Sequence, residues 1–566
     1  MNGIHRRPRA RTLPLATVEA SPRLALPGGR LSRRSAFLGA RACGSLPLAA
    51  APLLFGTLLL ASAEAPGPAH VDWTRGIEKQ TEAAREATRE VEPGLPAAAR
   101  ALALLADPSG YVRDAVFLAI QEKWSEEALV ALAPGLLSDE PLVAAAVAEL
   151  FGRRRPAAGL ESLTRALSRH PDTGARALMA WAAGEYGDAA AIAALREQWR
   201  RDRDWEVRAE ILLLLGRLER TAAREAIDEA LAEKKALPLR IAGLRALEQY
   251  DGPGAAAAAL AQLTEPPKDR QQVWGPRIEL AALGTLARAD RLAVPRETLV
   301  AAIDRILATL DESSGRARRS RFETLAAITG ESMPFEALNW RAWWGTVREK
   351  WQPGAVASAA GGADGGEPAH GGTAVVRFHG IPVDSMRVTF LQDLSGGMSR
   401  NLAGEEAGAG PSRLDHAKEE LVRVLGALDD RTWVNVITFA SSYWAPNPEP
   451  QLLGAARKKL AAFCREQQIP TASGHARGNV FDPLAFAATS PYVDTIYLVS
   501  EGAPTEGKYH DYDRFLWHFE RLNRWSLARV HVLLVAETGG RNRAFLGALA
   551  GSTGGEVRAV TATEKE

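Results

Sequence analysis

Two acidic residues and a hydroxyl lie at or just beyond the ends of two apolar and β-branched runs in the C-terminal third of the chain. Asp393 and Ser395 come after the run 388–391, and Glu501 comes after a second run, 495–500. If both runs are strands of one parallel sheet, their carboxyl ends meet at the edge where such sheets bind ligands. Carboxylate and hydroxyl oxygens, completed by water, are the ligands that Mg²⁺ takes. The spacing therefore predicts a ligand site at this edge of the sheet.

A third loop is expected at the same edge, where Gly478, Asn479 and Asp482 open a helix. Together the three segments resemble a von Willebrand factor type A domain, over about residues 377–566. In that family an Asp-x-Ser-x-Ser loop, a Thr and a later Asp form a metal-ion-dependent adhesion site. The resemblance implies a Mg²⁺ ion with one coordination position open for a partner's carboxylate.

The sequence departs from the family pattern at three positions. Gly397 stands in place of the second Ser, Gly478 in place of the Thr, and Glu501 in place of the Asp. Asp393, Ser395 and Glu501 remain the candidate ligands of a degenerate site, and Mg²⁺ remains its candidate cofactor. The alternative is a metal-free pocket whose residues cap loops and helices and bind by shape and hydrogen bonding.

The C-terminal region alternates strands with helices, which predicts a largely parallel, helix-flanked sheet. The expected strands lie near 386–393, 432–440, 494–500, 529–536 and 555–561. The expected helices lie near 412–427, 451–467, 481–488, 511–524 and 541–550.

Residues 95–352 are rich in Ala and Leu and repeat with a period near 32 residues. Each unit has a turn and then an aliphatic residue with Arg at a helix start, except that the unit at Val143 lacks the Arg. The pattern resembles HEAT-type repeats, which stack into a solenoid because each helical pair has an apolar face that it cannot bury alone. We expect the repeated arginines to bond to adjacent turns, which is a structural role; they are Arg113, Arg176, Arg208, Arg240 and Arg277.

Two further features of the repeat region have alternative explanations. Trp340, Trp343 and Trp344 could bind a ligand, but a cap on the last repeat is the favoured interpretation, because terminal repeats need closure. The basic run 153–155 is interpreted as a solvated face, because acidic residues are interspersed and the net charge is only +1.

The first 65 residues have the order of a bacterial export signal. Arg33 and Arg34 precede the apolar run 46–60, and the small residues 61–63 follow. The paired arginines resemble a twin-arginine signal, and an uncleaved signal anchor is the alternative. Cys43 and Cys464 are the two cysteines, so removal of the leader leaves no intramolecular disulfide.

The predicted organisation is multidomain, with an all-α HEAT-like solenoid followed by an α/β doubly wound domain. A Gly- and Ala-rich linker predicts that the two are tethered rather than fused. The expected segments are the leader 1–65, a helical lead-in 66–94, the solenoid with its Trp-rich cap 95–352, the linker 353–376 and the sheet domain 377–566.

The motifs of several enzyme classes are missing from the sequence. It holds no Gly-x-x-x-x-Gly-Lys-Ser/Thr loop, and no Gly-x-Ser-x-Gly or His-Glu-x-x-His motif. We therefore expect an exported, non-enzymatic interaction protein, periplasmic or in the cell envelope. Its partners would be proteins and not nucleic acid, and it would meet the membrane only through an uncleaved anchor. The alternative is an accessory subunit of a larger ATPase or envelope-enzyme complex.

Overall fold

A computed structural model describes residues 73–91, 97–354, 375–405, 410–472, 475–502, 504–536 and 539–560. All of them belong to one compact unit, Cys43–Glu566. The predicted leader and most of the predicted linker lie outside the described residues. Within the described ranges, no helix combines the length and the apolar character needed to cross a membrane.

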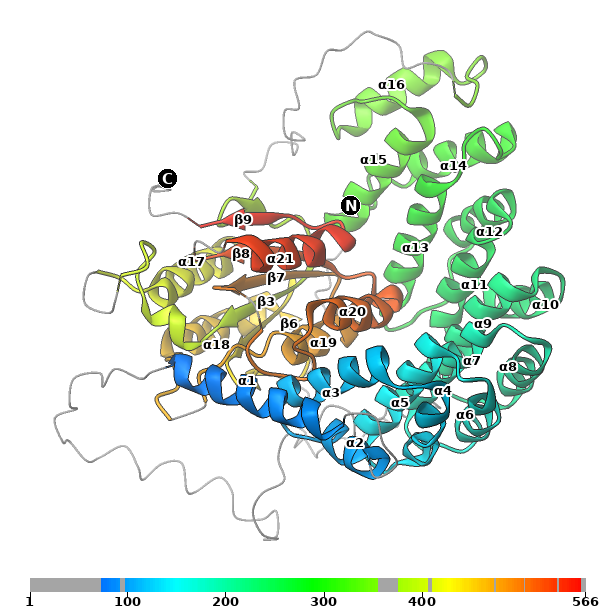
Figure 1. The fold of residues 1–566 in the computed structure, drawn as a ribbon. Helices are drawn as coiled ribbons and strands as arrows, with labels where there is room; N and C mark the ends of the chain where they lie inside the picture. The colour runs from blue at the N-terminus through cyan, green and yellow to red at the C-terminus, as the bar shows by residue number, and fades with distance from the viewer. Residues whose placement is uncertain are drawn as a thin grey trace, which may run out of the picture. The chain divides into compact units, whose positions relative to one another are not determined.

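Helices alone build the N-terminal half of the described chain, which confirms the predicted all-α solenoid (Figure 1). After the lead-in helix α1 (Trp73–Glu90), the second helices of successive pairs pack on one another along the solenoid. The first helices are α2 (Ala97–Leu105), α4 (Glu126–Val130), α6 (Leu160–Leu167), α8 (Ala189–Arg201), α10 (Arg220–Leu231), α12 (Gly252–Thr264) and α14 (Arg296–Ala308). The second helices are α3 (Gly110–Lys123), α5 (Pro141–Arg154), α7 (Thr173–Tyr186), α9 (Trp205–Leu218), α11 (Pro238–Glu248), α13 (Gly275–Arg288) and α15 (Gly315–Thr329), and α16 (Ala337–Val347) closes the series.

Glycine recurs where neighbouring second helices approach most closely. A Cβ on Gly152 would overlap the ring of Trp181, and one on Gly184 would overlap the side chain of Leu214. A Cβ on Gly216 would come within 3.1 Å of the Ala246 carbonyl oxygen in the following repeat, which is a tight contact rather than an overlap. The spacing between these glycines equals the repeat period, so the sequence supplies a residue without a side chain at each of these contacts between repeats.

The C-terminal region forms a seven-stranded sheet in the order β5-β4-β3-β7-β8-β9, with β6 also paired to β4. The neighbours from β4 to β9 are parallel, and β5 and β6 pair antiparallel at the β4 edge. A separate hairpin joins β1 (Arg377–Phe378) to β2 (Ile381–Pro382). The strands are β3 (Arg387–Asp393), β4 (Trp433–Phe439), β5 (Tyr443–Trp444), β6 (Gln451–Leu452), β7 (Thr495–Ser500), β8 (Arg529–Leu534) and β9 (Val557–Ala559).

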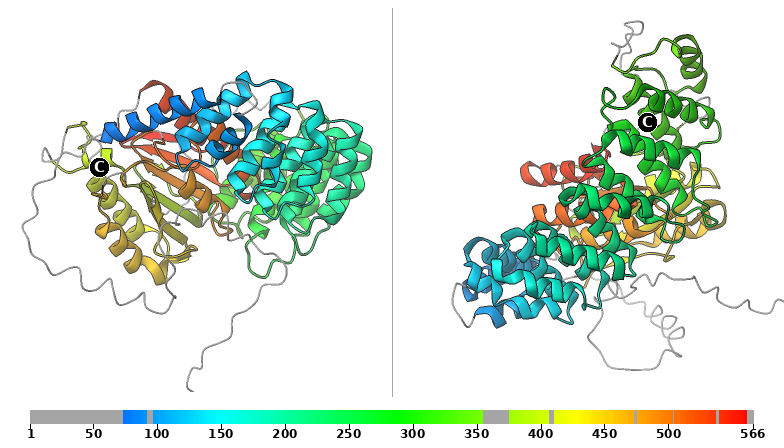
Figure 2. Two further views of the ribbon diagram at one scale, coloured as in Figure 1. Left: turned by 60° about the horizontal axis from the view of Figure 1, so that its bottom comes forward. Right: turned by 90° about the vertical axis from the view of Figure 1, so that its right-hand side faces the viewer.

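Helices cover both faces of this sheet, as the doubly wound prediction requires (Figure 2). One core lies under α17 (Arg413–Ala427) and α18 (Leu453–Glu466). The other lies under α19 (Phe481–Thr489), α20 (Tyr512–Ser526) and α21 (Gly540–Ser552). The central strands are buried on both faces, because each core takes alternate side chains of the same strand. Residues 375–560 are called the sheet domain below.

The prediction that solenoid and sheet domain are only tethered is wrong. Trp525 of α20 is buried in the hydrophobic core of the solenoid, and Trp517 and Leu527 pack against that core. Arg277 of α13 donates to the carbonyls of Ser490 (2.6 Å) and Val493 (3.0 Å) in the sheet domain. Linker composition describes how two domains are joined by the chain; it says nothing about how their surfaces fit.

Candidate functional site

The structure brings Asp393, Ser395 and Glu501 together at the carboxyl end of the sheet. Asp393 is the last residue of β3, and its Oδ1 accepts the backbone N–H of Ser395 (2.7 Å). Its Oδ2 accepts the hydroxyl of Ser500 at the end of β7 (3.0 Å). The Ser395 hydroxyl donates to Glu501 Oε1 (3.1 Å). The parallel pairing of β3 with β7 is what places these groups side by side.

Gly397 and Glu501 occupy one space between them. A Cβ on Gly397 would overlap the Glu501 carboxylate. The missing side chain at 397 therefore makes room for the longer acid at 501. Gly397 and Glu501, two of the three departures from the family pattern, therefore compensate each other in side-chain volume.

A cation from the chain itself completes this cluster. Arg413, the first residue of α17, is buried, and its Nη1 donates to the carbonyl of Gly397 (3.0 Å) and lies 3.4 Å from Glu501 Oε2. A positive charge at a helix N-terminus runs against the helix dipole. The carboxylate of Glu501 offsets that unfavourable placement.

Burial, together with the nearby Glu501 carboxylate, raises the pKa of Asp393 to about 7. Asp393 is 1% exposed, and water is the best solvent for a charged carboxylate. The hydrogen bonds from Ser395 and Ser500 act in the opposite direction, because they favour the charged form. The arrangement is a closed carboxylate site, stabilised from within the chain.

These residues do not fit a Mg²⁺ ion. Mg²⁺ needs near-octahedral oxygen geometry, yet two positions where the family pattern has hydroxyl ligands are occupied by Gly397 and Gly478, which have no side-chain oxygen. A divalent ion beside Glu501 would also meet the guanidinium of Arg413. Across the described ranges, no group of three or more His, Cys, Asp or Glu side chains is arranged to hold a metal ion.

Gly478, Asn479 and Asp482 form a neighbouring network rather than part of this cluster. The N–H of Gly478 donates to the hydroxyl of Thr505 (2.8 Å), and the amide of Asn479 donates to Asp482 Oδ2 (2.7 Å). Gly507 passes so close to Asn479 that a side chain would not fit there. The network therefore ties the loop before α19 to the loop between β7 and α20.

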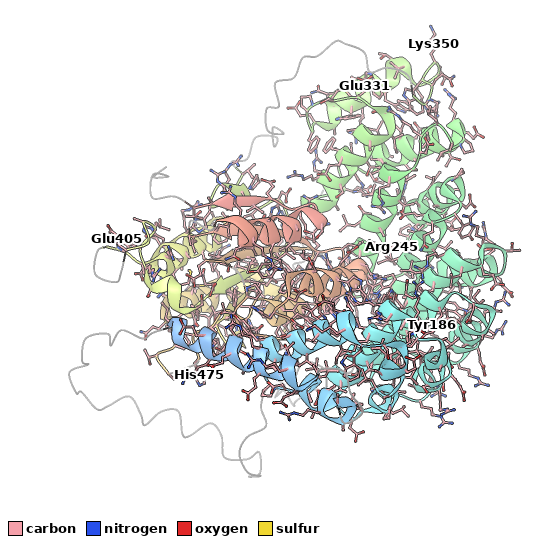
Figure 3. All side chains as sticks on the ribbon, in the orientation of Figure 1. Tyr186, Arg245, Glu331, Lys350, Glu405 and His475 are labelled. Atoms are coloured by element: carbon pink, nitrogen blue, oxygen red, sulfur yellow. The ribbon has the colours of Figure 1, made fainter. Side chains whose placement is uncertain are left out.

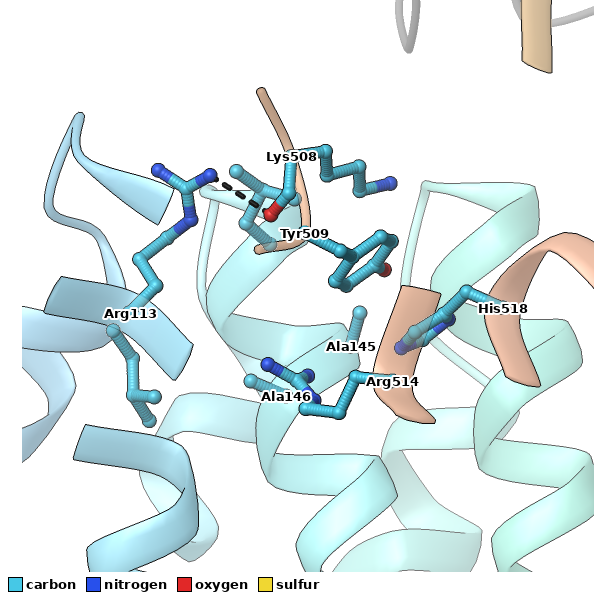
Figure 4. Close-up of a pocket in the computed structure, with 9 residues that line it drawn as sticks. Arg113, Ala145, Ala146, Lys508, Tyr509, Arg514 and His518 are labelled. Atoms are coloured by element: carbon cyan, nitrogen blue, oxygen red, sulfur yellow. Dashed lines mark hydrogen bonds between the residues drawn. The ribbon is translucent and has the colours of Figure 1, made fainter. Parts of the chain in front are cut away.

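The first described repeat of the solenoid holds that same β7–α20 loop. Arg113 donates to the carbonyls of Gly507 (3.0 Å) and Lys508 (2.9 Å), and the second of these bonds is drawn in Figure 4. Asp114 accepts the N–H groups of His510 (2.6 Å) and Asp511 (2.7 Å). Glu501 is the first residue of this loop and belongs to the carboxylate site. The solenoid therefore holds the other end of the same loop.

Glu149 of α5 is the centre of a buried ion network between solenoid and α20. Arg514 lies 2.6 Å from Glu149, His518 lies 3.0 Å from it, and Arg514 also pairs with Asp114. Burial raises the pKa of Glu149, but Arg514 and His518 outweigh it and hold that pKa well below its usual range. Burial lowers the pKa of His518 to about 3.

A cavity of about 20 Å³ lies beside the network, which is room for one water molecule. Its lining comes from both domains (Figure 4). The residues include Arg113, Ala145 and Ala146 from the solenoid, and Tyr509, Arg514 and His518 from the sheet domain.

The contact continues along α20 at the spacing of one helix face. Trp517 meets Trp181 of α7 edge to face, with ring centroids 4.8 Å apart. Arg521 (3.2 Å) and Arg524 (3.0 Å) both pair with Glu210 of α9. Arg245 of α11, labelled in Figure 3, lies near enough to α20 for charges on that helix to influence its pKa. Burial lowers the pKa of Arg245 to about 10.

Three of the five repeated arginines stay within the solenoid. Arg176 bonds to Asp202 (3.0 Å) and to turn carbonyls, Arg208 pairs with Glu229 (2.9 Å), and Arg240 donates to the carbonyl of Glu233 (2.7 Å). Arg113 and Arg277, by contrast, reach carbonyls of the sheet domain. One repeated residue type thus serves both stacking and docking.

At the tryptophan-rich end of the solenoid, two of the three clustered tryptophans are buried. Trp340 and Trp344 are buried, and Trp344 donates to Asp304 of α14 (2.7 Å). Leu338, on the same helix, is 77% exposed.

Sequence reasoning missed the role of Arg413. Its signal was the unusual cation at the first position of a helix, directly after the site loop. It also missed the docking surface, whose signal was an acid in the middle of an apolar helix, as at Glu149 and Glu210.

Comparisons with known proteins give a partial match. The family described as HEAT repeats matches residues 129–213. A comparison with curated proteins finds no match. Among solved structures, an aerotolerance-related membrane protein from Bacteroides fragilis is 16% identical, with a TM-score of 0.23, covering 31% of this chain and 91% of that one. A mutant of the PilB minor pilin from Streptococcus sanguinis is 18% identical, with a TM-score of 0.23, covering 31% of this chain and 57% of that one.

Proposed function

We propose that this chain is an exported, non-enzymatic scaffold that binds a protein partner, with a von Willebrand factor type A-like domain whose adhesion site is degenerate. The supporting observation is an open hollow of about 460 Å³ on the solenoid, lined by Arg153, Arg154, Arg155, Trp181 and Glu185. HEAT-type solenoids offer extended binding surfaces, and here α20 already occupies part of the surface.

The hollow carries an excess of positive charge. Arg155 is exposed, and the single acid, Glu185, is paired with Arg217 (2.9 Å). Arg153 and Arg154 are held in place, Arg153 by Glu149 (2.9 Å) and Arg154 by the carbonyl of Trp124 (3.1 Å). Arg153 and Arg155 are exposed, as expected of a solvated basic face, whereas Arg154 is half-buried. Fixed guanidinium groups beside a tryptophan ring suit an acidic peptide segment.

The test is co-isolation from the native host. The full chain, cross-linked in cells, should bring down a stoichiometric protein partner, and Arg155→Glu should remove it. Arg169→Glu is the matched control, because Arg169 is also exposed on the solenoid but lies outside the hollow. Equal capture by both variants, or no stoichiometric partner, would contradict the proposal.

Export has a separate test. Residues 1–65 fused to a reporter that is active only outside the cytoplasm should confer activity, and replacement of Arg33 and Arg34 by Lys should report whether the twin-arginine route is used. The alternative function, an accessory subunit of an ATPase or envelope-enzyme complex, is favoured if the captured partner is such an enzyme. In either case the partner would be a protein, with no role for nucleic acid, and the membrane would be met only through an uncleaved N-terminal anchor.

A further inference from the structure

We propose that Arg413 is a built-in cation that takes over the neutralising role of a divalent metal ion at the carboxyl end of the sheet. This inference is independent of the protein partner. It rests on the disagreement between the metal site that the sequence resembles and the side chains that the structure places there.

The overlap between a Cβ at 397 and the Glu501 carboxylate means that a hydroxyl at 397 and this acid exclude each other. With the hydroxyl absent, Glu501 reaches inward to accept a hydrogen bond from Ser395 (3.1 Å).

Asp393 and Glu501 bring two carboxyl groups to one small region, and the two groups interact. Arg413, with its side chain 7% exposed, brings the compensating charge to 3.4 Å from Glu501. A guanidinium ion is charged at any pH that the protein meets, whereas a metal ion must be supplied.

A metal-dependent site leaves one coordination position open for a partner's carboxylate. Here the cation belongs to the chain, and its Nη1 is engaged by the Gly397 carbonyl (3.0 Å) and by Glu501. The Nη1 group is therefore already engaged within the chain, while the Nε of Arg413 is buried without a hydrogen-bond partner among the described residues.

The first measurement is calorimetric titration of the full chain with MgCl₂ and MnCl₂, together with thermal unfolding in the presence and absence of EDTA. We expect no saturable heat at low-millimolar ion and no change in Tm with chelator. Saturable binding that is lost in Asp393→Asn would overturn the proposal.

The second measurement is a double-mutant cycle between Arg413→Met and Glu501→Gln. If Arg413 neutralises Glu501, Arg413→Met should lower Tm by about 1 °C more with Glu501 present than with Gln at that position. The lost hydrogen bond to Gly397 is common to both backgrounds and cancels. Equal losses in the two backgrounds would overturn the proposal.

Two further variants make the cycle specific. Arg400→Met removes an exposed arginine nearby and should leave Tm unchanged. Arg413→Lys keeps the charge and should lie closer to the wild type than Arg413→Met, which keeps the test usable if the Met variant does not fold. A Lys variant as unstable as the Met variant would count against a charge-based role.

Discussion

Glu149→Ala should destabilise the whole described unit, because Glu149 joins the solenoid to α20. The carboxylate is fully buried, with Arg514 at 2.6 Å, Arg153 at 2.9 Å and His518 at 3.0 Å. Removal of one partner of a buried ion pair costs about 3–5 kcal/mol. Arg514 keeps Asp114 as a second partner, so we expect a loss near the lower end, about 3 kcal/mol. Urea unfolding followed by circular dichroism and by tryptophan fluorescence measures this loss.

Glu161→Ala is the matched control for that experiment. Glu161 also pairs with an arginine four residues later on a solenoid helix (2.5 Å to Arg165), but its side chain is 82% exposed. Exposed pairs of this kind contribute about 0–1 kcal/mol. If the two variants lose the same stability, Glu149 is not the anchor that the geometry indicates. A double-mutant cycle with Arg514→Met should further give a large coupling energy, and additive losses would show that Glu149 and Arg514 do not stabilise each other.

The structure makes two further predictions. His518 faces Glu149, Arg514, Lys508 and Tyr509, and burial lowers its pKa to about 3. It is therefore neutral in the folded protein near neutral pH. The free energy of unfolding should be highest above pH 6.5 and should fall between pH 6.5 and 3, because the unfolded chain takes up a proton at His518 in this range. His518→Gln should flatten this acid limb in pH-dependent unfolding, whereas the exposed control His475→Gln, at the position labelled in Figure 3, should not. Gly397→Ser should lower Tm, because the new side chain would overlap Glu501. The double variant Gly397→Ser with Glu501→Asp should recover part of the lost Tm. A Gly397→Ser variant as stable as the wild type would show that the overlap relaxes without cost.

The elements of the sheet domain were predictable because local pattern and tertiary environment agree. Each buried strand is an apolar run, and each predicted strand and helix appears within a few residues of its expected bounds. The edge strands β5 and β6 were missed, because two-residue antiparallel pairings leave almost no pattern in a sequence. Asp393, Ser395 and Glu501 could be brought together in advance, since parallel strands place their carboxyl ends at one edge.

The partners of those residues could not be predicted in the same way. The sequence places Arg413 at a helix start, but only packing turns its side chain toward Glu501. The docking of α20 depends on two surfaces whose residues are more than 300 positions apart, as with Glu149 and Arg514. The face of α20 did carry a local signal, because Arg514, Trp517, His518, Arg521 and Arg524 recur at helical spacing.

The contacts of α20 indicate that solenoid and sheet domain form one cooperative body. Hydrogen exchange of the full chain, read by mass spectrometry, tests this most directly. We predict that the amides of α20 and of α5, α7 and α9 exchange with the same opening free energy, and that Glu149→Ala lowers all of them together. Exchange of α20 at a much lower opening free energy than the solenoid helices, unchanged by Glu149→Ala, would contradict the account.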